Sequence, residues 1–82
     1  MDNHYSMWIK WNCPFCQSAQ DEMRRQKVSY TVHVMDDEIE KLDKLREVWD
    51  WPTVPLVTTF RDGEEVLVGG YDDLKTCFDE AK

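Results

Sequence analysis

The chain has 82 residues, of which 17 are Asp or Glu and 10 are Lys or Arg, giving a net charge of −7. This length predicts one domain, residues 1–82, with a small core. The acidic balance argues against nucleic acid as a partner, because phosphate binding requires clustered Lys and Arg. The uncharged stretch 51–60 has only ten residues and two prolines, so we expect no membrane-spanning segment.

The chain contains three cysteines, Cys13, Cys16 and Cys77. They are too few and too unevenly spaced for the disulfide framework of a secreted protein. The first twenty residues also lack the basic and apolar regions of a secretory signal. We therefore expect a cytoplasmic protein in a reducing compartment.

The first predicted elements are a strand and a helix. Tyr5–Trp11 is short and rich in β-forming residues, which predicts a buried strand. From Pro14 to about Gln26, the residues Cys16, Ala19 and Met23 recur at helical spacing. This segment is predicted to be a helix with a narrow apolar stripe.

A second strand and a second helix follow. Apolar and polar residues alternate over Val28–Val34, which predicts a strand. Asp36 and Asp37 are candidate caps for a helix that ends near Trp49. Its apolar stripe would consist of Ile39, Leu42, Leu45 and Val48.

The C-terminal part predicts a hairpin and a last helix. Leu56–Phe60 and Glu65–Val68 are β-rich and flank Asp62-Gly63, a strong signal for an antiparallel hairpin. After Gly69-Gly70, either Asp72 or Asp73 would cap a helix. Its apolar face would be formed by Leu74, Cys77, Phe78 and Ala81.

The order β-α-β-α-β-β-α predicts an α/β fold. A right-handed crossover makes the first two strands parallel, and the hairpin adds an antiparallel pair. We expect one four-stranded mixed sheet flanked by three helices.

Cys13-Pro14-Phe15-Cys16 is the segment that points to chemistry. Two residues between the cysteines place their sulfurs nearly one helical turn apart, close enough to form a disulfide. Pro14 suits the first helical position and would place Cys13 at the helix N-terminus. The unpaired amides and the helix dipole there favour the thiolate, which is the nucleophilic form.

Four motifs in order resemble the glutaredoxin family over nearly the whole chain. They are Lys10, the Cys13-Pro14-Phe15-Cys16 segment, Thr53-Val54-Pro55, and Gly69-Gly70-Tyr71-Asp72-Asp73. The resemblance implies a minimal thioredoxin fold in which Cys13 attacks, Cys16 resolves and Pro55 is a cis-proline. Phe15 stands where the family often has tyrosine, so a role that needs the hydroxyl is lost.

The resemblance also implies a binding site for glutathione, an anionic tripeptide. Lys10 would pair with one carboxylate, and the backbone of Val54, after Thr53 and before Pro55, would bond to the tripeptide as to an added strand. The second carboxylate would lie over the amides that follow Gly70, with Asp72 taking the ammonium group. Phe15 and Tyr71 complete the predicted site.

The implied function is a glutathione-dependent oxidoreductase, active on protein disulfides and glutathione mixed disulfides. Small size and an acidic surface also suit an electron donor to ribonucleotide reductase, as the resemblance suggests for small glutaredoxins, including viral ones. We expect a monomer without a metal.

Three alternatives stay open at this stage. A thioredoxin-like protein would be recharged by a flavoprotein reductase, although Asn12 precedes the pair here and proline directly follows Cys13. A metal-binding or cluster-carrying module would require further ligands, because zinc takes four. A non-catalytic interaction domain would require an unreactive Cys13.

Overall fold

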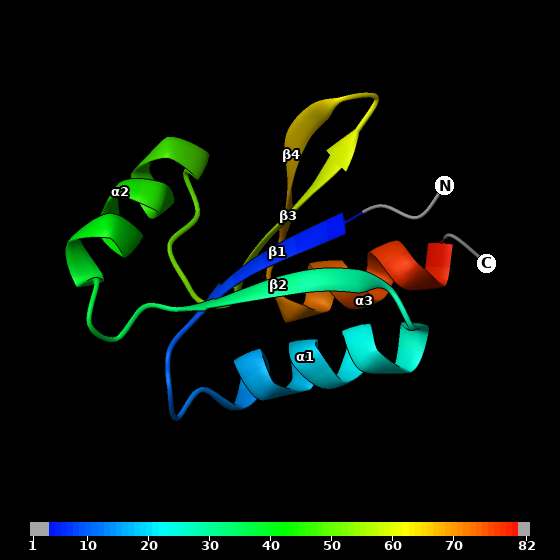
Figure 1. The fold of residues 1–82 in the computed structure, drawn as a ribbon, viewed down its shortest axis with the longest axis horizontal. Coiled ribbons are helices and arrows are strands. Elements are labelled where there is room, and N and C mark those ends of the chain that lie inside the picture. The colour runs from blue at the N-terminus through cyan, green and yellow to red at the C-terminus, as the bar shows by residue number, and fades with distance from the viewer. Residues whose placement is uncertain (1–3, 81–82) are drawn as a thin grey trace.

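The computed structural model describes residues 4–80 and has the predicted order of elements (Figure 1). The elements are β1 (His4–Ile9), α1 (Pro14–Gln26), β2 (Ser29–Val34), α2 (Ile39–Trp49), β3 (Leu56–Arg61), β4 (Glu64–Gly69) and α3 (Tyr71–Glu80). The four strands form one mixed sheet in the order β2-β1-β3-β4. The α/β prediction is therefore confirmed.

The pairing of the strands follows from how the chain connects them. β1 and β2 are parallel and joined by α1, whereas β1 pairs antiparallel with β3, and β3 with β4. Asp62 and Gly63 have φ values of 52° and 84°, the left-handed region that a tight two-residue hairpin turn requires. The predicted hairpin is confirmed.

Helices α1 and α3 lie side by side on one face of the sheet (Figure 1). The main core fills the space between them and the strands, and its fully buried members include Met7, Ala19, Met23, Val57 and Leu74. Of these residues, Ala19, Met23 and Leu74 are on the stripes that the sequence periodicity predicted for α1 and α3. The N-termini of α1 and α3 lie close together, since the rings of Phe15 and Tyr71, in the first turns of the two helices, have centroids 6.3 Å apart.

The first strand is shorter than predicted. It ends at Ile9, and the next residues turn, with Asn12 at a positive φ of 54°. A residue in that conformation cannot continue a strand. The prediction of a strand to Trp11 is wrong, and the difference matters because this turn delivers the chain to Cys13.

The predicted cap of α2 is also wrong. Glu38 is the N-cap and makes no side-chain capping bond, while Asp36 accepts a hydrogen bond from the Trp11 amide instead. Of the predicted apolar stripe only Leu42 is fully buried, and Val48 is 73% exposed. Figure 1 shows the reason, since α2 lies beyond the end of the sheet and apart from α1 and α3.

Asp73 is the residue that caps α3. Its carboxylate accepts a hydrogen bond from the Gly70 amide at 3.1 Å, reaching back from the first turn of the helix. Asp72 is exposed and makes no such bond among the residues that the structure describes. Cys77 is half-buried on α3, and Ala81 lies outside the described residues.

Candidate functional site

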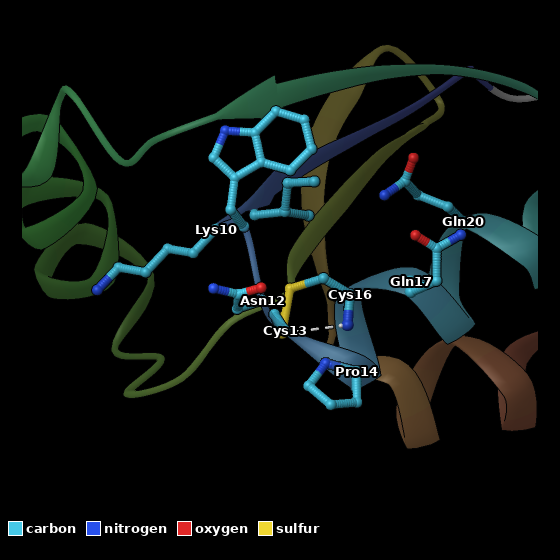
Figure 2. A pocket seen from close by; sticks show the side chains of 9 residues that line it. Lys10, Asn12, Cys13, Pro14, Cys16, Gln17 and Gln20 are labelled. Atoms are coloured by element: carbon cyan, nitrogen blue, oxygen red, sulfur yellow. Dashed lines mark hydrogen bonds between the residues drawn. A yellow bond between two sulfur atoms is a disulfide. The ribbon is translucent and has the colours of Figure 1, made fainter.

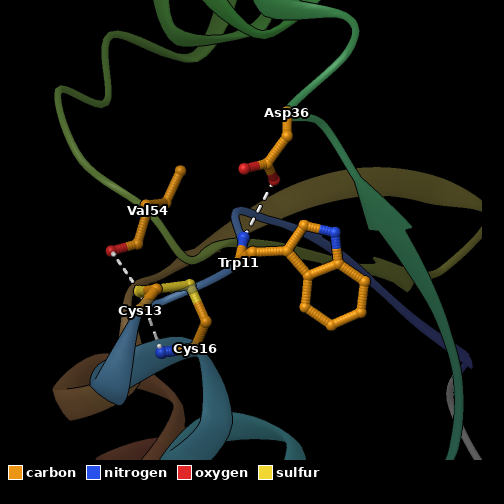
Figure 3. Close-up of a disulfide and its surroundings, with 5 residues drawn as sticks. All are labelled: Trp11, Cys13, Cys16, Asp36 and Val54. Atoms are coloured by element: carbon orange, nitrogen blue, oxygen red, sulfur yellow. Dashed lines mark hydrogen bonds between the residues drawn. A yellow bond between two sulfur atoms is a disulfide. The ribbon is translucent and has the colours of Figure 1, made fainter.

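Cys13 and Cys16 form a disulfide at the N-terminus of α1 (Figure 3). Cys13 is the N-cap, with an extended backbone, and Pro14 is the first helical residue. The Sγ atom of Cys13 accepts a hydrogen bond from the Cys16 amide at 3.2 Å. An amide directed at this sulfur would also stabilise negative charge on it after reduction.

The two sulfurs differ in their access to solvent. Cys16 is 1% exposed and belongs to the main core, whereas Cys13 is half-buried at the surface of that core. A disulfide partner can therefore approach Cys13 more readily than Cys16. This asymmetry fits a reaction in which Cys13 attacks the substrate disulfide and Cys16 then attacks Cys13 from within the protein.

Pro55 follows a cis peptide bond, as the resemblance implied. The Val54 carbonyl oxygen lies 4.0 Å from the Sγ atom of Cys13, so this loop faces the disulfide (Figure 3). Among the described residues, the backbone of Val54 has no backbone hydrogen-bond partner. An extended peptide could therefore bond to it beside Cys13.

A groove of about 360 Å³ lies on this side of the disulfide, and we call it the Tyr71 groove. It brings together every predicted glutathione-binding residue except Lys10. Its lining residues are Phe15, Trp51, Thr53, Val54, Pro55, Gly70, Tyr71, Asp72 and Asp73. Three segments that are distant in sequence thus converge on one surface.

Trp51 and Asp73 line the Tyr71 groove but were not among the predicted site residues. A Cβ atom at Gly70 would lie 3.3 Å from the Trp51 ring, so the indole packs closely over this glycine and would have to shift slightly for a larger residue. Phe15 and Tyr71 also line this groove, with ring centroids 6.3 Å apart. The sequence signal that could have placed Trp51 in the lining of this groove was its position between two of the motifs.

A second groove of about 450 Å³ lies next to the disulfide, and we call it the Lys10 groove (Figure 2). It is lined by Ile9, Lys10, Trp11, Asn12, Cys13, Pro14, Cys16, Gln17 and Gln20. Figure 2 shows the Lys10 side chain extending away from the sulfur atoms, with Gln17 and Gln20 entering from α1. The predicted cation is therefore next to the cysteines but outside the Tyr71 groove.

The two grooves differ in charge. The Tyr71 groove is lined by two carboxylates, those of Asp72 and Asp73, and by no lysine or arginine. The Lys10 groove is lined by one lysine and by no carboxylate. The disulfide therefore stands between an acidic, aromatic surface and a basic surface rich in side-chain amides.

Residues 4–80 contain no helix that is long and apolar enough to cross a membrane. Within the same residues, no group of three or more His, Cys, Asp or Glu side chains is arranged to hold a metal ion.

The family model described as Glutaredoxin matches residues 5–66. The chain belongs to the glutaredoxin family. As a glutaredoxin it is a thiol-disulfide oxidoreductase with Cys13–Cys16 as its redox-active disulfide. No curated protein sequence matches this glutaredoxin.

Solved structures are similar to this glutaredoxin along most of its length. Wheat glutaredoxin is 26% identical with a TM-score of 0.74, over 94% of this chain and 69% of the wheat chain. Glutaredoxin from Brucella melitensis is 23% identical with a TM-score of 0.69, over 100% and 83% of the two chains. Spinach chloroplast thioredoxin f shares the fold at 16% identity, with a TM-score of 0.62 over 98% of this chain and 76% of its own.

Proposed function

We propose that this protein is a glutathione-dependent oxidoreductase that reduces protein disulfides and glutathione mixed disulfides. The observation that carries the proposal is the convergence of Phe15, Val54, Tyr71 and their neighbours in one groove beside the more accessible cysteine. Glutathione enters as the reductant. The family match supports the disulfide chemistry, and the Tyr71 groove supports glutathione as the reductant.

In the proposed reaction, the reduced protein gives two electrons to its substrate. The Cys13 thiolate attacks one sulfur of the substrate disulfide, forms a mixed disulfide and releases the other sulfur as a thiolate. Cys16 then loses its proton and attacks Cys13, which closes the Cys13–Cys16 disulfide and releases the second substrate thiol. Two glutathione molecules return the protein to the dithiol and leave as oxidised glutathione.

We place glutathione along the Tyr71 groove with its cysteine at Cys13. Its backbone would pair with the free Val54 N–H and C=O, next to Thr53 and Pro55. The γ-glutamyl carboxylate would accept hydrogen bonds from the backbone amides that follow Gly70, because the Gly70 amide already donates to Asp73. Asp72 would take the ammonium group, and Lys10 would reach the remaining carboxylate from the neighbouring groove.

Three narrower expectations stay predictions. They are an electron-donor role toward ribonucleotide reductase, a monomeric state and a cytoplasmic location. Small size and acidic charge support the electron-donor role, and the small number of cysteines supports a reducing compartment.

Turnover of a small glutathione mixed disulfide tests the proposal, with NADPH and glutathione reductase regenerating glutathione. We expect NADPH oxidation that depends on the protein and on glutathione and is abolished in Cys13→Ser. Recharging by thioredoxin reductase, with no activity through glutathione, would overturn the choice of thiol while leaving the disulfide chemistry in place.

A further inference from the structure

We propose that the Lys10 groove is the docking site for protein clients and that Trp11 is its anchor. The occupant we infer is an extended client segment in which an apolar and an acidic residue flank the reacting cysteine. The inference rests on the proposed function only in requiring disulfide exchange at Cys13. It assigns client proteins to the side of the disulfide that lies away from the Tyr71 groove.

The first observation is the exposure of Trp11 beside the reacting sulfur. Its side chain is 69% exposed, the second highest exposure among the large apolar residues described after Val48 at 73%. Figure 3 shows Trp11 and Val54 on opposite sides of the disulfide. An exposed indole buries a large apolar area on contact, and tryptophan is enriched among residues that dominate binding energy.

The second observation is that the backbone of Trp11 is held in place. The Asp36 carboxylate accepts a hydrogen bond from the Trp11 amide at 2.8 Å, across 25 residues of sequence. The next residue, Asn12, has the positive φ that completes the turn. An anchor fixed before binding loses less conformational entropy when the client arrives.

The third observation is charge complementarity. Lys10 is the only charged residue among those that line this groove, in a protein with a net charge of −7. An acidic client segment would be repelled by the Asp72 and Asp73 side of the disulfide and attracted to the Lys10 side. The Lys10 groove therefore favours clients that carry an acidic residue near the reacting cysteine.

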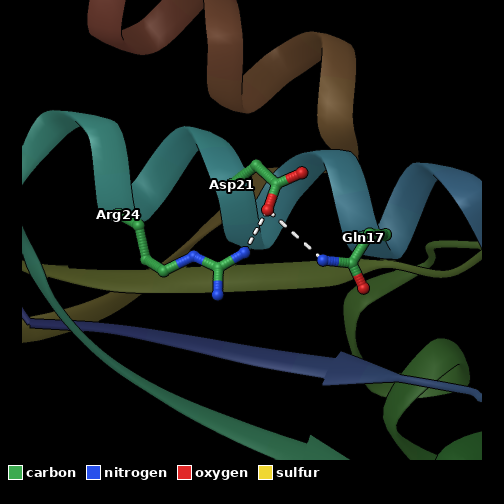
Figure 4. A network of polar contacts seen from close by, with 3 residues as sticks. All are labelled: Gln17, Asp21 and Arg24. Atoms are coloured by element: carbon green, nitrogen blue, oxygen red, sulfur yellow. Dashed lines mark hydrogen bonds and ion pairs between the residues drawn. The ribbon is translucent and has the colours of Figure 1, made fainter.

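Side-chain amides supply the remaining polar contacts. Gln17 donates from its Nε2 atom to Asp21 at 3.3 Å, and Asp21 also pairs with Arg24 (Figure 4). Within the described residues, this leaves the Gln17 carbonyl oxygen without a partner. It can accept a backbone N–H from an extended segment lying along the groove.

The reaction with the client is a disulfide exchange at Cys13 and Cys16. Cys13 forms a mixed disulfide with one client sulfur and releases the other as a thiolate. Cys16 then displaces the client from Cys13, and the client leaves with two thiols after taking up protons from water. The reduced protein supplies both electrons, so this half of the cycle requires no glutathione.

A single-turnover experiment isolates this step. The pre-reduced full chain is mixed with a disulfide-bonded peptide, free thiols are trapped at set times, and the masses of the products give the rate. Three peptides of equal length are compared, with Leu and Asp, Leu and Lys, or two Ser residues beside the same cysteine. Trp11→Ala is tested against Phe60→Ala, which removes another exposed aromatic side chain, 47% exposed, near the far end of β3.

We expect the Leu-Asp peptide to react about fivefold faster than the Leu-Lys peptide and about tenfold faster than the Ser peptide. Trp11→Ala should remove the advantage of the Leu-Asp peptide over the Ser peptide, and Phe60→Ala should retain it. Equal rates for the three peptides, or equal losses in the two variants, would overturn the inference. Because no glutathione is present, neither result depends on the thiol that recharges the protein.

Discussion

Cys13 and Cys16 are three residues apart, yet their surroundings assign them different tasks. Cys16 is buried in the core and Cys13 lies at its edge, beside Val54. The sequence predicts this asymmetry, because Pro14 places Cys13 at the helix end and Cys16 one turn inside. The pair therefore contains one sulfur that meets substrates and one that releases them.

Replacing the second cysteine should separate the two reactions. Cys16→Ser retains the Cys13 thiol, so reduction of a glutathione mixed disulfide should remain within a few-fold of the unmodified protein. Reduction of protein disulfides should fall by about tenfold or more, because the mixed disulfide with the client has no internal thiol to resolve it. Steady-state assays with both substrates check this, with Cys77→Ser as the matched control.

Equal losses on the two substrates in Cys16→Ser would contradict the assigned roles. A comparable loss in Cys77→Ser would also contradict them, because Cys77 is on α3 and lines neither groove.

Asp36 fixes the turn that precedes Cys13, a role that no pattern in the sequence predicted. The residue is a plausible helix cap by type and position, and only the folded chain brings it to the Trp11 amide. Such contacts depend on the relative placement of β1, β2 and α2. Local patterns do not encode that placement, which is why the cap prediction was wrong.

Removing the Asp36 carboxylate should loosen this turn. Asp36→Ala should lower the free energy of unfolding by about 1 kcal/mol and slow protein-disulfide reduction several-fold, because a hydrogen bond from the Trp11 amide is lost. Asp36→Asn retains an acceptor oxygen, so both the free energy of unfolding and the rate of protein-disulfide reduction should fall less than in Asp36→Ala. Chemical denaturation and steady-state assays check this, and the matched control Asp37→Ala should change neither quantity.

At the scale of elements, the sequence predicted every helix and strand but not all of their ends. Periodicity identified α1, α3 and β2, and β-forming composition identified the other three strands, because their apolar residues do face the main core. The stripe of α2 was misleading, since the helix lies beyond the sheet and buries only Leu42 completely. Burial along a helix depends on where the helix docks, and the stripe alone does not determine that.

The cap of α3 offers a direct test of one element boundary. Asp73→Ala removes the acceptor for the Gly70 amide and should lower the free energy of unfolding by about 1 kcal/mol. Asp72→Ala removes an equal charge from the same turn without removing a cap, so it should lower the free energy of unfolding by less. Urea denaturation of the two variants gives the comparison, and a larger loss for Asp72→Ala would contradict the capping assignment.

At the scale of the whole molecule, one buried phenol couples stability to pH. Burial, and then the neighbouring Cys77 thiol, raise the pKa of Tyr5 above its ordinary value of 10.0, with Arg61 opposing the shift. The folded protein therefore holds this proton more tightly than the unfolded chain does. The contribution to stability is complete below pH 10.0 and is lost as the pH rises through the raised pKa.

We expect the free energy of unfolding to decline above pH 10.0, with a smaller decline in Tyr5→Phe, which has no phenol to ionise. Denaturation at a series of alkaline pH values measures this. Tyr30→Phe retains Tyr5 and should retain the decline. The same slope in Tyr5→Phe and in the unmodified protein would contradict the assignment.

The fold as a whole brings four motifs from three distant parts of the sequence to one end of the sheet and leaves a groove on each side of the disulfide. Through the family resemblance, the sequence predicted the residues of the Tyr71 groove except Trp51 and Asp73. It did not predict that Lys10 would line a different groove, because the turn at Asn12 directs the chain away from β1.

The proposed exchange of electrons between the Cys13–Cys16 disulfide and glutathione can be measured on the intact protein. The most direct measurement is the intact mass of the full chain after thiol trapping, across a series of reduced and oxidised glutathione ratios. We predict one transition in which Cys13 and Cys16 gain two hydrogens together, with a midpoint in the family range of about −200 to −230 mV. A disulfide that stays oxidised at every glutathione ratio, yet is reduced by a dithiol reagent, would contradict the proposed exchange.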